Sequence, residues 1–352
     1  MAIVKSNAYG HGLLEVAKTL TTYNLQLTTG VWFGVDNLEE AFQLKKCGVR
    51  DPILILGYIP RPRLAEAIKN GFRFALYDID VLKECARIAK KLHKTALVHI
   101  KVETGTYRQG LLHADIAKFA GLLRTYSPVV KPEGVYTHFA DTEDMSSQYY
   151  KEQLHLFKKS ISLFKDHGIT TAYQHVAASA ATLLYPKTHF NMVRWGIGLY
   201  GLYPSQSVQS SALHMLRKMQ LRPVMTWKTR ITQVKKVSKG ETIGYDRTFS
   251  ARKPITIAIL PVGYWDGYDR RFSNNGHVLI GGKKCPIVGI ICMNMCMVDV
   301  TRMPGAYAGD EAVLLGRQGT HEISVEELAA KIGTINYEIV TRINPLIPRI
   351  LV

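Results

Sequence analysis

The first residues with chemical potential lie at the amino end of the chain, in the stretch MAIVKSNAYGHG. The apolar residues 2–4 predict a short buried strand, and the amine of Lys5 follows where that strand ends. A lysine amine becomes a nucleophile toward carbonyl groups when it lies in a desolvated, positively charged pocket. At the carboxyl end of a barrel strand, Lys5 would lie on the face where α/β barrels carry catalytic groups. Taken alone, a surface lysine is the simpler interpretation, so further residues must decide.

Polar residues also follow four later apolar stretches, at the point where each stretch ends. They are Lys101, Glu103 and Arg108 in KVETGTYRQG, His138 in VYTHFAD, His175 and Ser179 in HVAASAA, and Arg194, Gly196 and Gly198 in MVRWGIGLYG. A serine that opens a helix, together with a glycine-rich turn, offers backbone N–H groups and a positive helix end to an anion. Because the carboxyl ends of barrel strands share one rim, these residues predict a pocket for a phosphate-bearing cofactor that Lys5 binds.

The elements that would position these residues alternate between strand and helix up to about Tyr203. Eight short apolar runs predict strands at 2–4, 32–35, 53–56, 72–76, 96–102, 135–139, 172–176 and 192–195. Amphipathic stretches such as NLEEAFQLKKCG and KEQLHLFKKSISLFKDHG lie between most of them. Strand–helix alternation indicates parallel pairing, and eight such units close a (β/α)8 barrel. The predicted fold class is therefore α/β, with a TIM-type barrel over residues 1–211.

Residues 212–352 are predicted to form a second, mainly antiparallel β domain. After GLYPSQSVQSS the chain becomes a series of apolar, β-rich runs separated by glycine-rich turns. The pair Asn275-Gly276 is a strong hairpin signal. One helix interrupts the strands late in the chain, where Ser324 and Glu327 form a capping-box pattern in ISVEELAAKIG.

The composition excludes several classes of protein. The 352 residues are 47% hydrophobic, so a sizeable core can form, yet no apolar run is long enough to span a bilayer. Five cysteines in no paired framework suit a reducing compartment, and we expect a cytoplasmic protein. Cys292 and Cys296 lack a second pair of ligands, so we expect no metal site. The net charge of +17 is spread along helices, which favours small anions over nucleic acid as partners.

The motifs resemble those of alanine racemases, the bacterial enzymes that use pyridoxal 5′-phosphate (PLP). The resemblance runs over essentially the whole chain and rests on AIVKSNAYGHG, KVETGTYRQG, YTHFAD, HVAASAA, MVRWGIGLYG, GYDRTF, LPVGYWDGY and GIICMNMCMVD. It implies a PLP-binding barrel followed by a β-rich domain, and the interconversion of L-alanine and D-alanine for cell-wall precursors. It also implies a head-to-tail homodimer whose active sites take residues from both subunits.

The resemblance implies two bases on opposite faces of the substrate. Lys5 matches the lysine that carries PLP and serves as one base, and Tyr245 matches the tyrosine that the partner subunit contributes as the other. Removal of an α-proton from one face and its return on the other requires such a pair. PLP supplies the electron sink, while the protein supplies placement and charge.

Other matching positions imply contacts with the cofactor. The residues that fall where the family binds the phosphate are Tyr9, Ser179, Gly196 and Ile197. Arg194 matches the arginine that faces the ring nitrogen, with His175 in support, and His138 matches the histidine that orients the tyrosine. An arginine partner leaves the ring nitrogen unprotonated, which weakens the electron sink and discourages decarboxylation and transamination.

The remaining matches imply contacts with the substrate. Arg108 resembles the residue that reaches the cofactor oxygen and the substrate carboxylate, and Lys101 falls where members can carry a carbamate that steadies this arginine. Met293 falls where a backbone amide receives the carboxylate, and Tyr264 matches a tyrosine that narrows the entrance. The departures from the family pattern are Thr106, Tyr107, Ala178, Asn294 and Pro345.

Several other interpretations stay open at this stage. Within the same enzyme class, the alternative is a racemase of serine or of a broader set of amino acids, because the width of the substrate pocket is not readable from sequence. A related PLP decarboxylase is disfavoured, because that group pairs the ring nitrogen with a carboxylate where Arg194 stands. A non-catalytic PLP carrier would lack the β-rich domain and Tyr245.

The start of the chain motivates one further expectation. Family members have a few dozen residues ahead of the lysine block, and these are absent here. We therefore expect that Met1 is an internal methionine or that the chain is truncated, which keeps an inactive paralogue among the alternatives. A first strand without its lead-in should fray, and Lys5 with it.

Overall fold

The computed structural model describes residues 1–24, 30–216 and 220–352. The chain divides into two compact units. The first consists of residues 1–8 and 13–222, and the second of residues 9–12 and 223–352. Residue 211, the boundary expected from the sequence, lies inside helix α9 (Gln206–Leu216), which the structure groups with the first unit.

A curled parallel sheet forms the centre of the first unit, as the strand–helix alternation predicts. Its strands are β1 (Ala2–Ile3), β2 (Phe33–Val35), β3 (Ile53–Ile55), β4 (Arg73–Leu76), β5 (Ala96–Lys101), β6 (Val130–Tyr136) and β7 (Tyr173–His175). The strands pair in chain order, and every pair is parallel. All carboxyl ends therefore meet at one rim, where α/β barrels carry their sites.

The expected eighth strand, residues 192–195, is reduced to a single bridge between Trp195 and Ala2. Trp195 N donates to Met1 O at 2.9 Å, and Ile3 N donates to Trp195 O at 2.9 Å. The segment is too short for a strand because Gly196 turns the backbone into the 3-10 helix η4 (Ile197–Tyr200) directly afterwards. These bonds nevertheless connect the last barrel segment to the first strand.

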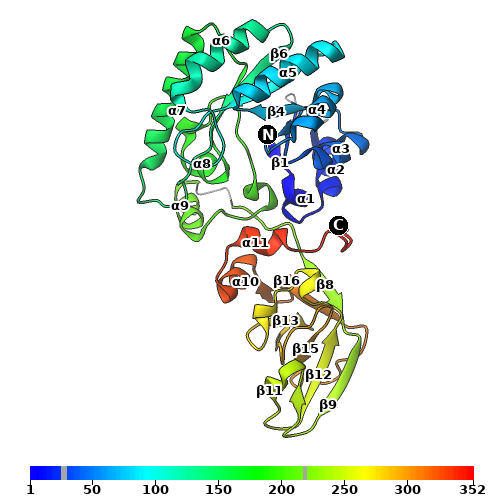
Figure 1. Cartoon of the computed structure of the whole chain (residues 1–352). Coiled ribbons are helices and arrows are strands. Elements are labelled where there is room, and N and C mark those ends of the chain that lie inside the picture. Colours follow the sequence, from blue (N-terminus) through cyan, green and yellow to red (C-terminus); the bar gives the residue numbers. More distant parts are fainter. Residues whose placement is uncertain (25–29, 217–219) are drawn as a thin grey trace. The chain divides into compact units, whose positions relative to one another are not determined.

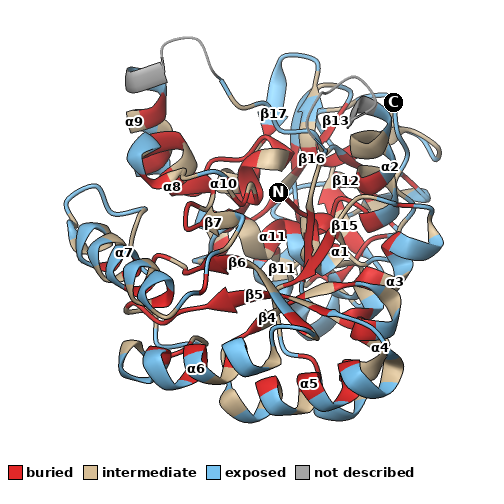
Figure 2. Ribbon diagram, turned by 90° about the horizontal axis from the view of Figure 1, so that it is seen from above, coloured by how far each residue is buried: buried red, intermediate tan, exposed pale blue. Residues whose placement is uncertain are grey.

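Helices surround this sheet and bury one face against it (Figure 1). Besides α9 they are α2 (Leu13–Asn24), α3 (Leu38–Lys46), α4 (Leu64–Asn70), α5 (Ile79–Leu92), α6 (Ile116–Tyr126), α7 (Tyr149–Asp166) and α8 (Ser179–Leu184), with 3-10 turns η1 (Arg61–Arg63), η2 (His113–Asp115) and η3 (Pro186–Thr188). Figure 2 shows buried residues along β5 and exposed residues on the outer faces of α5 and α6. Helix α5 is capped by Asp78, whose side chain accepts a hydrogen bond from Val81 N at 2.8 Å.

The second unit is mainly antiparallel, as expected. One sheet has the strand order β15 (Cys296–Asp299), β12 (Ile255–Leu260), β9 (Gln233–Val237). A second sheet contains β14 (Lys283–Pro286), β13 (His277–Ile280), β16 (Glu311–Gln318), β17 (His321–Ile323) and β8 (Trp227–Arg230). A third, two-stranded sheet pairs β10 (Thr242–Ile243) with β11 (Phe249–Ser250). Short 3-10 turns are η5 (Tyr245–Arg247), η6 (Tyr264–Asp266) and η7 (Arg270–Phe272). Two helices follow, α10 (Val325–Ile332) and α11 (Asn336–Thr341). Helix α10 begins where the sequence predicted, since Ser324 Oγ accepts from Glu327 N at 3.0 Å.

The hairpin predicted at Asn275-Gly276 is wrong. The turn between the paired strands β13 and β14 is Gly281-Gly282, where both glycines have positive φ (54° and 73°), as a two-residue hairpin turn requires. Gly276 precedes β13, and a Cβ there would lie 2.7 Å from Ile287 Cδ1. This glycine therefore provides space for a neighbouring side chain.

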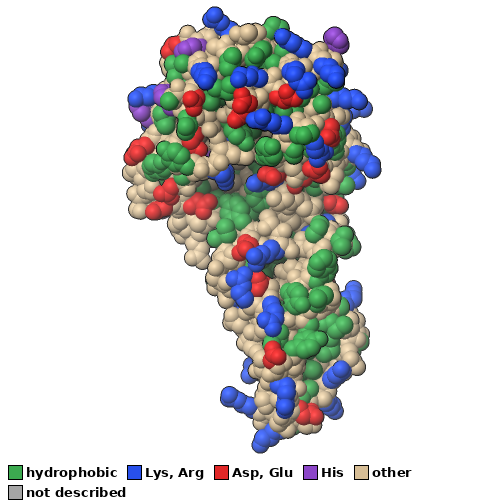
Figure 3. Space-filling view, viewed as in Figure 1, with side chains coloured by type: hydrophobic (Ala, Val, Ile, Leu, Met, Phe, Trp, Pro, Cys, Tyr) green, Lys and Arg blue, Asp and Glu red, His purple; other side chains and the backbone are tan. Residues whose placement is uncertain are grey.

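Basic residues are dispersed, as the sequence suggested. On the face shown in Figure 3, Lys and Arg side chains are scattered among acidic and apolar ones and do not form a single patch. Among the helices of the described residues, none combines the length and apolar character needed to cross a bilayer.

The segment 9–12 is fixed to the second unit by its backbone. Arg349 donates to Gly10 O from Nε at 3.0 Å and from Nη2 at 2.7 Å. The rings of Tyr9 and Tyr337 have their centroids 6.1 Å apart. Gly10 has a φ of 82°, and a Cβ at this position would lie 1.9 Å from Val340 O. Only glycine therefore fits both the conformation and the space.

We predict that Gly10→Ala destabilises the protein more than Gly48→Ala. Both glycines have positive φ, but a Cβ at Gly48 would meet nothing within 4 Å. Gly48→Ala should cost about 1 kcal/mol for the left-handed backbone alone, and Gly10→Ala about 1–3 kcal/mol more because of the clash. Urea unfolding of the two variants measures the difference, and equal midpoints would contradict the steric argument.

Candidate active site in the first unit

Lys5 follows β1 and opens a left-handed turn. Ser6, Asn7, Ala8 and Tyr9 all have φ between 52° and 56°, a conformation that L-residues adopt at a cost of about 1–2 kcal/mol each. The Glu40 carboxylate compensates, because its Oε1 accepts from Ser6 N at 2.5 Å while its Oε2 accepts from Asp36 N at 2.8 Å. One carboxylate thus joins the loops that follow β1 and β2.

This turn places the Lys5 amine at the rim. Lys5 Nζ lies 3.9 Å from Asp36 Oδ1, and both side chains are partly exposed. At this distance the two groups form a loose ion pair, which is weak in water. The amine therefore remains accessible for reaction. The structure agrees with the predicted place of Lys5 just beyond the first strand.

The inward face of β5 carries His99 and Lys101, two residues apart on one strand. Lys101 is buried, and its Nζ lies 3.4 Å from Gln109 Oε1. Burial lowers the pKa of Lys101 to about 8, and the charges of Arg108 and Arg194 contribute in the same direction. Lys5 lowers the same pKa, so four cations act on one another in this region.

Arg194 is the most buried of these cations, with 4% of its surface exposed. Its Nη1 donates to His175 O at 3.0 Å, and its Nη2 donates to Thr137 O and Val176 O, each at 2.8 Å. The carbonyls belong to the chain at and just beyond the ends of β6 and β7. The sequence-predicted residues Arg194 and His175 therefore meet, at the end of β7.

Two histidines also contact Arg194. Nη1 lies 2.9 Å from His175 Nδ1, and Nη2 lies 3.0 Å from His138 Nδ1. Burial, followed by the charge of Arg194, holds the pKa of both histidines well below the usual range. Arg194 therefore carries the positive charge of this cluster, and both imidazoles are neutral.

Ser179 connects two short helices. Its Oγ accepts hydrogen bonds from Gly196 N at 3.0 Å and Gly198 N at 3.3 Å. Ser179 is the first residue of α8 and Ile197 the first of η4, and neither helix has a side-chain cap. The bonds bring two helix amino ends together, and their N–H groups and dipoles favour an anion.

Arg108 is exposed on the loop after β5, next to Tyr107, which has a φ of 49°. Three further predicted residues, Tyr245, Tyr264 and Met293, lie in the second unit and are also exposed. Tyr264 and Met293 occupy adjacent loops, since Tyr264 N donates to Cys292 O at 3.1 Å and Trp265 N to Met293 O at 2.9 Å.

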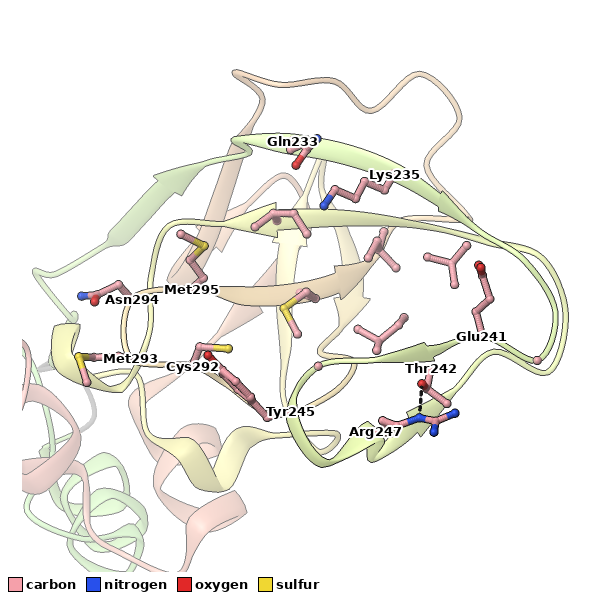
Figure 4. Close-up of a pocket in the computed structure, with 17 residues that line it drawn as sticks. Gln233, Lys235, Glu241, Thr242, Tyr245, Arg247, Cys292, Met293, Asn294 and Met295 are labelled. Carbon is pink, nitrogen blue, oxygen red and sulfur yellow. Dashed lines mark hydrogen bonds between the residues drawn. The ribbon is translucent and has the colours of Figure 1, made fainter.

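A broad, open pocket of about 1210 Å³ lies in the second unit. Tyr245 and Met293 line it, together with Cys292 and Asn294 (Figure 4). The other two predicted residues of this unit do not line the pocket: Tyr264 lies on the loop next to that of Met293, and Tyr9 lies beside Tyr337. The structure therefore assembles one cluster in each unit, a cationic one around Lys5 and a phenol–thioether one around Tyr245.

Sequence reasoning missed three residues that support the first cluster: Asp36, Glu40 and His99. His99 Nδ1 lies 2.8 Å from His175 Nε2. The spacing of His99 and Lys101 was a usable signal, because residues two apart on a strand face the same side. Nothing in the local sequence indicated that Glu40 would bind the backbone of Ser6, because that contact depends on the left-handed turn.

Comparison with known proteins identifies relatives over the full length. Residues 1–204 match the family model of the alanine racemase N-terminal domain, and residues 224–351 match that of the C-terminal domain. The chain is 40% identical over 350 residues to "Alanine racemase 1" of Caldanaerobacter subterraneus, covering 99% of this chain and 87% of the relative. It is 38% identical to an alanine racemase of Methanococcus maripaludis, covering 99% and 91%.

Solved structures show the same similarity. The alanine racemase of Streptomyces coelicolor superposes with a TM-score of 0.90 at 30% identity, covering 99% of this chain and 90% of that one. The alanine racemase of Bacillus anthracis with bound L-Ala-P gives a TM-score of 0.88 at 34% identity, covering 97% and 85%.

We predict that Lys101→Met stabilises the protein at pH 7 by about 3 kcal/mol. The folded pKa of Lys101, about 8, is lower than that of an unfolded lysine, so the unfolded chain binds more protons between pH 8 and about 10.4. The buried Lys101 ammonium therefore lowers the free energy of unfolding by the full amount below pH 8, and this loss disappears as the pH rises from 8 to about 10.4. Urea unfolding from pH 7 to 10.5 should show the free energies of unfolding of Lys101→Met and the unmodified protein converging.

Lys131→Met is the matched control, because Lys131 is an exposed lysine on the adjacent strand β6. The free energy of unfolding of Lys131→Met should differ from that of the unmodified protein by the same amount at every pH. If the difference in unfolding free energy between Lys101→Met and the unmodified protein is also independent of pH, the buried ammonium does not destabilise the folded protein.

Proposed function

The chain belongs to the alanine racemase family, and we propose that it interconverts L-alanine and D-alanine with PLP as its cofactor. The family is an isomerase family, and its two domains are matched over almost all of this chain. The observation that carries the proposal is the position of Arg194, a buried guanidinium between two neutral histidines at the end of β7.

The residues of the first unit fit the cofactor chemically. Lys5 offers an accessible amine to the aldehyde, and the paired helix starts at Ser179 and Ile197 offer N–H groups to the phosphate. Lys101 and Arg108 add positive charge, which favours a dianionic phosphate. Gly196 supports this group through its bond to Ser179, and we assign Tyr9 to the phosphate from the resemblance alone.

When bound, PLP withdraws electrons from the α-carbon of the amino acid, which makes the α-proton removable. Arg194 would face the ring nitrogen. Its hydrogen bonds to carbonyls and imidazoles keep it charged, so it leaves that nitrogen without a proton. A carboxylate in its place would stabilise the protonated form of that nitrogen and favour side reactions. The site therefore supports racemisation over decarboxylation.

Two bases complete the proposed mechanism. Lys5 Nζ takes or returns the proton on one face of the α-carbon, and Tyr245 does so on the other. We propose that Tyr245 comes from the partner subunit of a head-to-tail homodimer. His138 accepts from Arg194 at Nδ1, so its proton is on Nε2, where it can donate to a phenolate. Such a bond stabilises the basic form of the tyrosine.

The remaining residues bind the substrate. Arg108 and the backbone N–H of Met293 would hold the carboxylate, and Tyr264 would limit the size of the side chain that enters. Lys101 would support Arg108, directly or as a carbamate. We place the reaction in the cytoplasm, where D-alanine serves peptidoglycan synthesis; the cytoplasmic setting rests on the cysteine usage and stays a prediction.

Lys5 should be the residue that carries the cofactor. After incubation with PLP and reduction with borohydride, peptide mass mapping should place a pyridoxyl group on Lys5, and the unreduced protein should convert L-alanine to D-alanine in a coupled assay. Lys5→Ala should lose both properties, whereas Lys18→Ala, in which an exposed lysine of α2 is replaced, should keep both. Labelling of another lysine, or an inert protein, would overturn the proposal.

Shared active sites predict complementation between inactive variants. Lys5→Ala and Tyr245→Phe should each lose at least about 100-fold in kcat, because each lacks one base. Mixed and allowed to exchange subunits, they should form heterodimers in which one site contains both bases. Activity should then rise toward a quarter of that of the unmodified protein at equal amounts. No recovery in a mixture whose heterodimers are confirmed by mass spectrometry would exclude the shared site.

A further inference from the structure

His99 lies wholly inside the first unit, within contact of His175. It is fully buried, and its ring stacks nearly parallel to that of Tyr173, with centroids 6.1 Å apart and an interplanar angle of 12°. Trp32 covers another side, at 5.3 Å. Its Nδ1 lies 2.8 Å from His175 Nε2, and its own Nε2 has no hydrogen-bond partner among the described residues.

The proton positions in this chain of contacts follow from Arg194. A guanidinium only donates, so His175 Nδ1 must accept from Arg194 Nη1 and carries no proton. A neutral imidazole keeps one proton, so that of His175 is on Nε2 and is donated to His99 Nδ1. The proton of His99 is then on Nε2. Each tautomer is thus determined by its neighbour, starting from the arginine.

Both imidazoles are held neutral, which this assignment requires. Burial lowers the pKa of His99 to about 3, and the charges of Arg73 and Arg194 act in the same direction. The pKa of His175 is likewise held well below its usual range, first by burial and then by Arg194. Neither ring therefore becomes a double donor at neutral pH.

The fold also makes room for His99. Gly134 lies opposite His99 in the pairing of β5 with β6, where the register shifts by one residue. A Cβ at Gly134 would lie 2.4 Å from His99 Nδ1, the atom that meets His175. Any other residue at this position would displace the ring from its partner.

We propose that His99 is a positioning residue, whose Nδ1 accepts the Nε2 proton of His175 and so holds His175 in the one tautomer that can accept from Arg194. His99 would then act on the cofactor site through two hydrogen bonds without touching the cofactor. This inference rests on the proposed function only in its consequence for catalysis. The tautomers themselves follow from the contacts within the unit.

The tautomers can be measured directly. In the full-length protein labelled with 15N-histidine, with and without PLP, ring nitrogen shifts should show both His99 and His175 protonated at Nε2 only. Single-histidine variants assign the signals. A proton on Nδ1 of either residue would overturn the proposal, and this readout does not depend on racemase activity.

Two substitutions test the consequence. His99→Leu removes the acceptor and leaves the His175 Nε2 proton buried without a partner, whereas His99→Asn keeps an acceptor oxygen near the former Nδ1 position. We expect His99→Leu to lower kcat about tenfold, with little change in KM for alanine, to weaken PLP binding, and to change the His175 nitrogen shifts. His99→Asn should restore most of each property.

Gly134→Ala should move these properties in the same direction as His99→Leu while keeping the histidine. Ser160→Ala is the matched control, because Ser160 is buried and its Oγ donates to Leu156 O at 2.9 Å and lies 3.2 Å from His113 Nδ1, outside the Arg194–His175–His99 chain of hydrogen bonds. It should lower the melting temperature without altering kcat or the His175 shifts. Equal effects of His99→Leu and Ser160→Ala would show that His99 only supports packing.

The results separate the two proposals. If the unmodified protein neither binds PLP nor racemises alanine, the proposed function fails, while the nitrogen shifts still decide the tautomers. If the protein is an active racemase and His99→Leu leaves kcat and the His175 shifts unchanged, the role of His99 fails and the proposed function stands.

Discussion

The structure of the first unit depends on one buried charge, the guanidinium of Arg194. A cation removed from water must be surrounded by acceptors, and an isolated one would be prohibitively unfavourable. Here the acceptors are carbonyl oxygens of Thr137, His175 and Val176 and two imidazole nitrogens. The need to satisfy these donors fixes the ends of β6 and β7 against the segment that closes the sheet, and it also fixes which ring nitrogens carry protons.

A second constraint is the concentration of like charge at the rim. Burial lowers the pKa of Lys101, and the charges of Arg108, Arg194 and Lys5 lower it further. Without an anion, this repulsion opposes folding; a dianionic ligand would relieve it and bind more tightly for that reason. The left-handed turn after Lys5 adds backbone strain at the same place, a pattern common at functional sites. The same cluster of positive charges thus lowers the stability of the unliganded protein and raises its affinity for an anionic ligand.

Much of the architecture was predictable from the sequence, because strand and helix have different periods and the chain alternates between them. The parallel sheet, the β-rich second unit and the cap at Ser324 followed from such local rules. Features that depend on contacts between distant residues were not predictable. The strand expected at residues 192–195 is one bridge, because Gly196 turns the chain away, and the hairpin lies at Gly281-Gly282 since both positions need positive φ. His99 was overlooked because its importance comes from His175, 76 residues away.

The assignment of residues 9–12 to the second unit has a topological consequence. The polypeptide passes between the two units three times, after Ala8, after Gly12 and after Arg222. Neither unit is a continuous stretch of chain, so cutting the peptide bond at Arg222 would not release the carboxyl-terminal half as a complete module. A fragment of residues 223–352 would lack the carbonyl of Gly10 that Arg349 binds. A gene fusion that transfers only residues 223–352 would therefore leave residues 9–12 of the second unit behind.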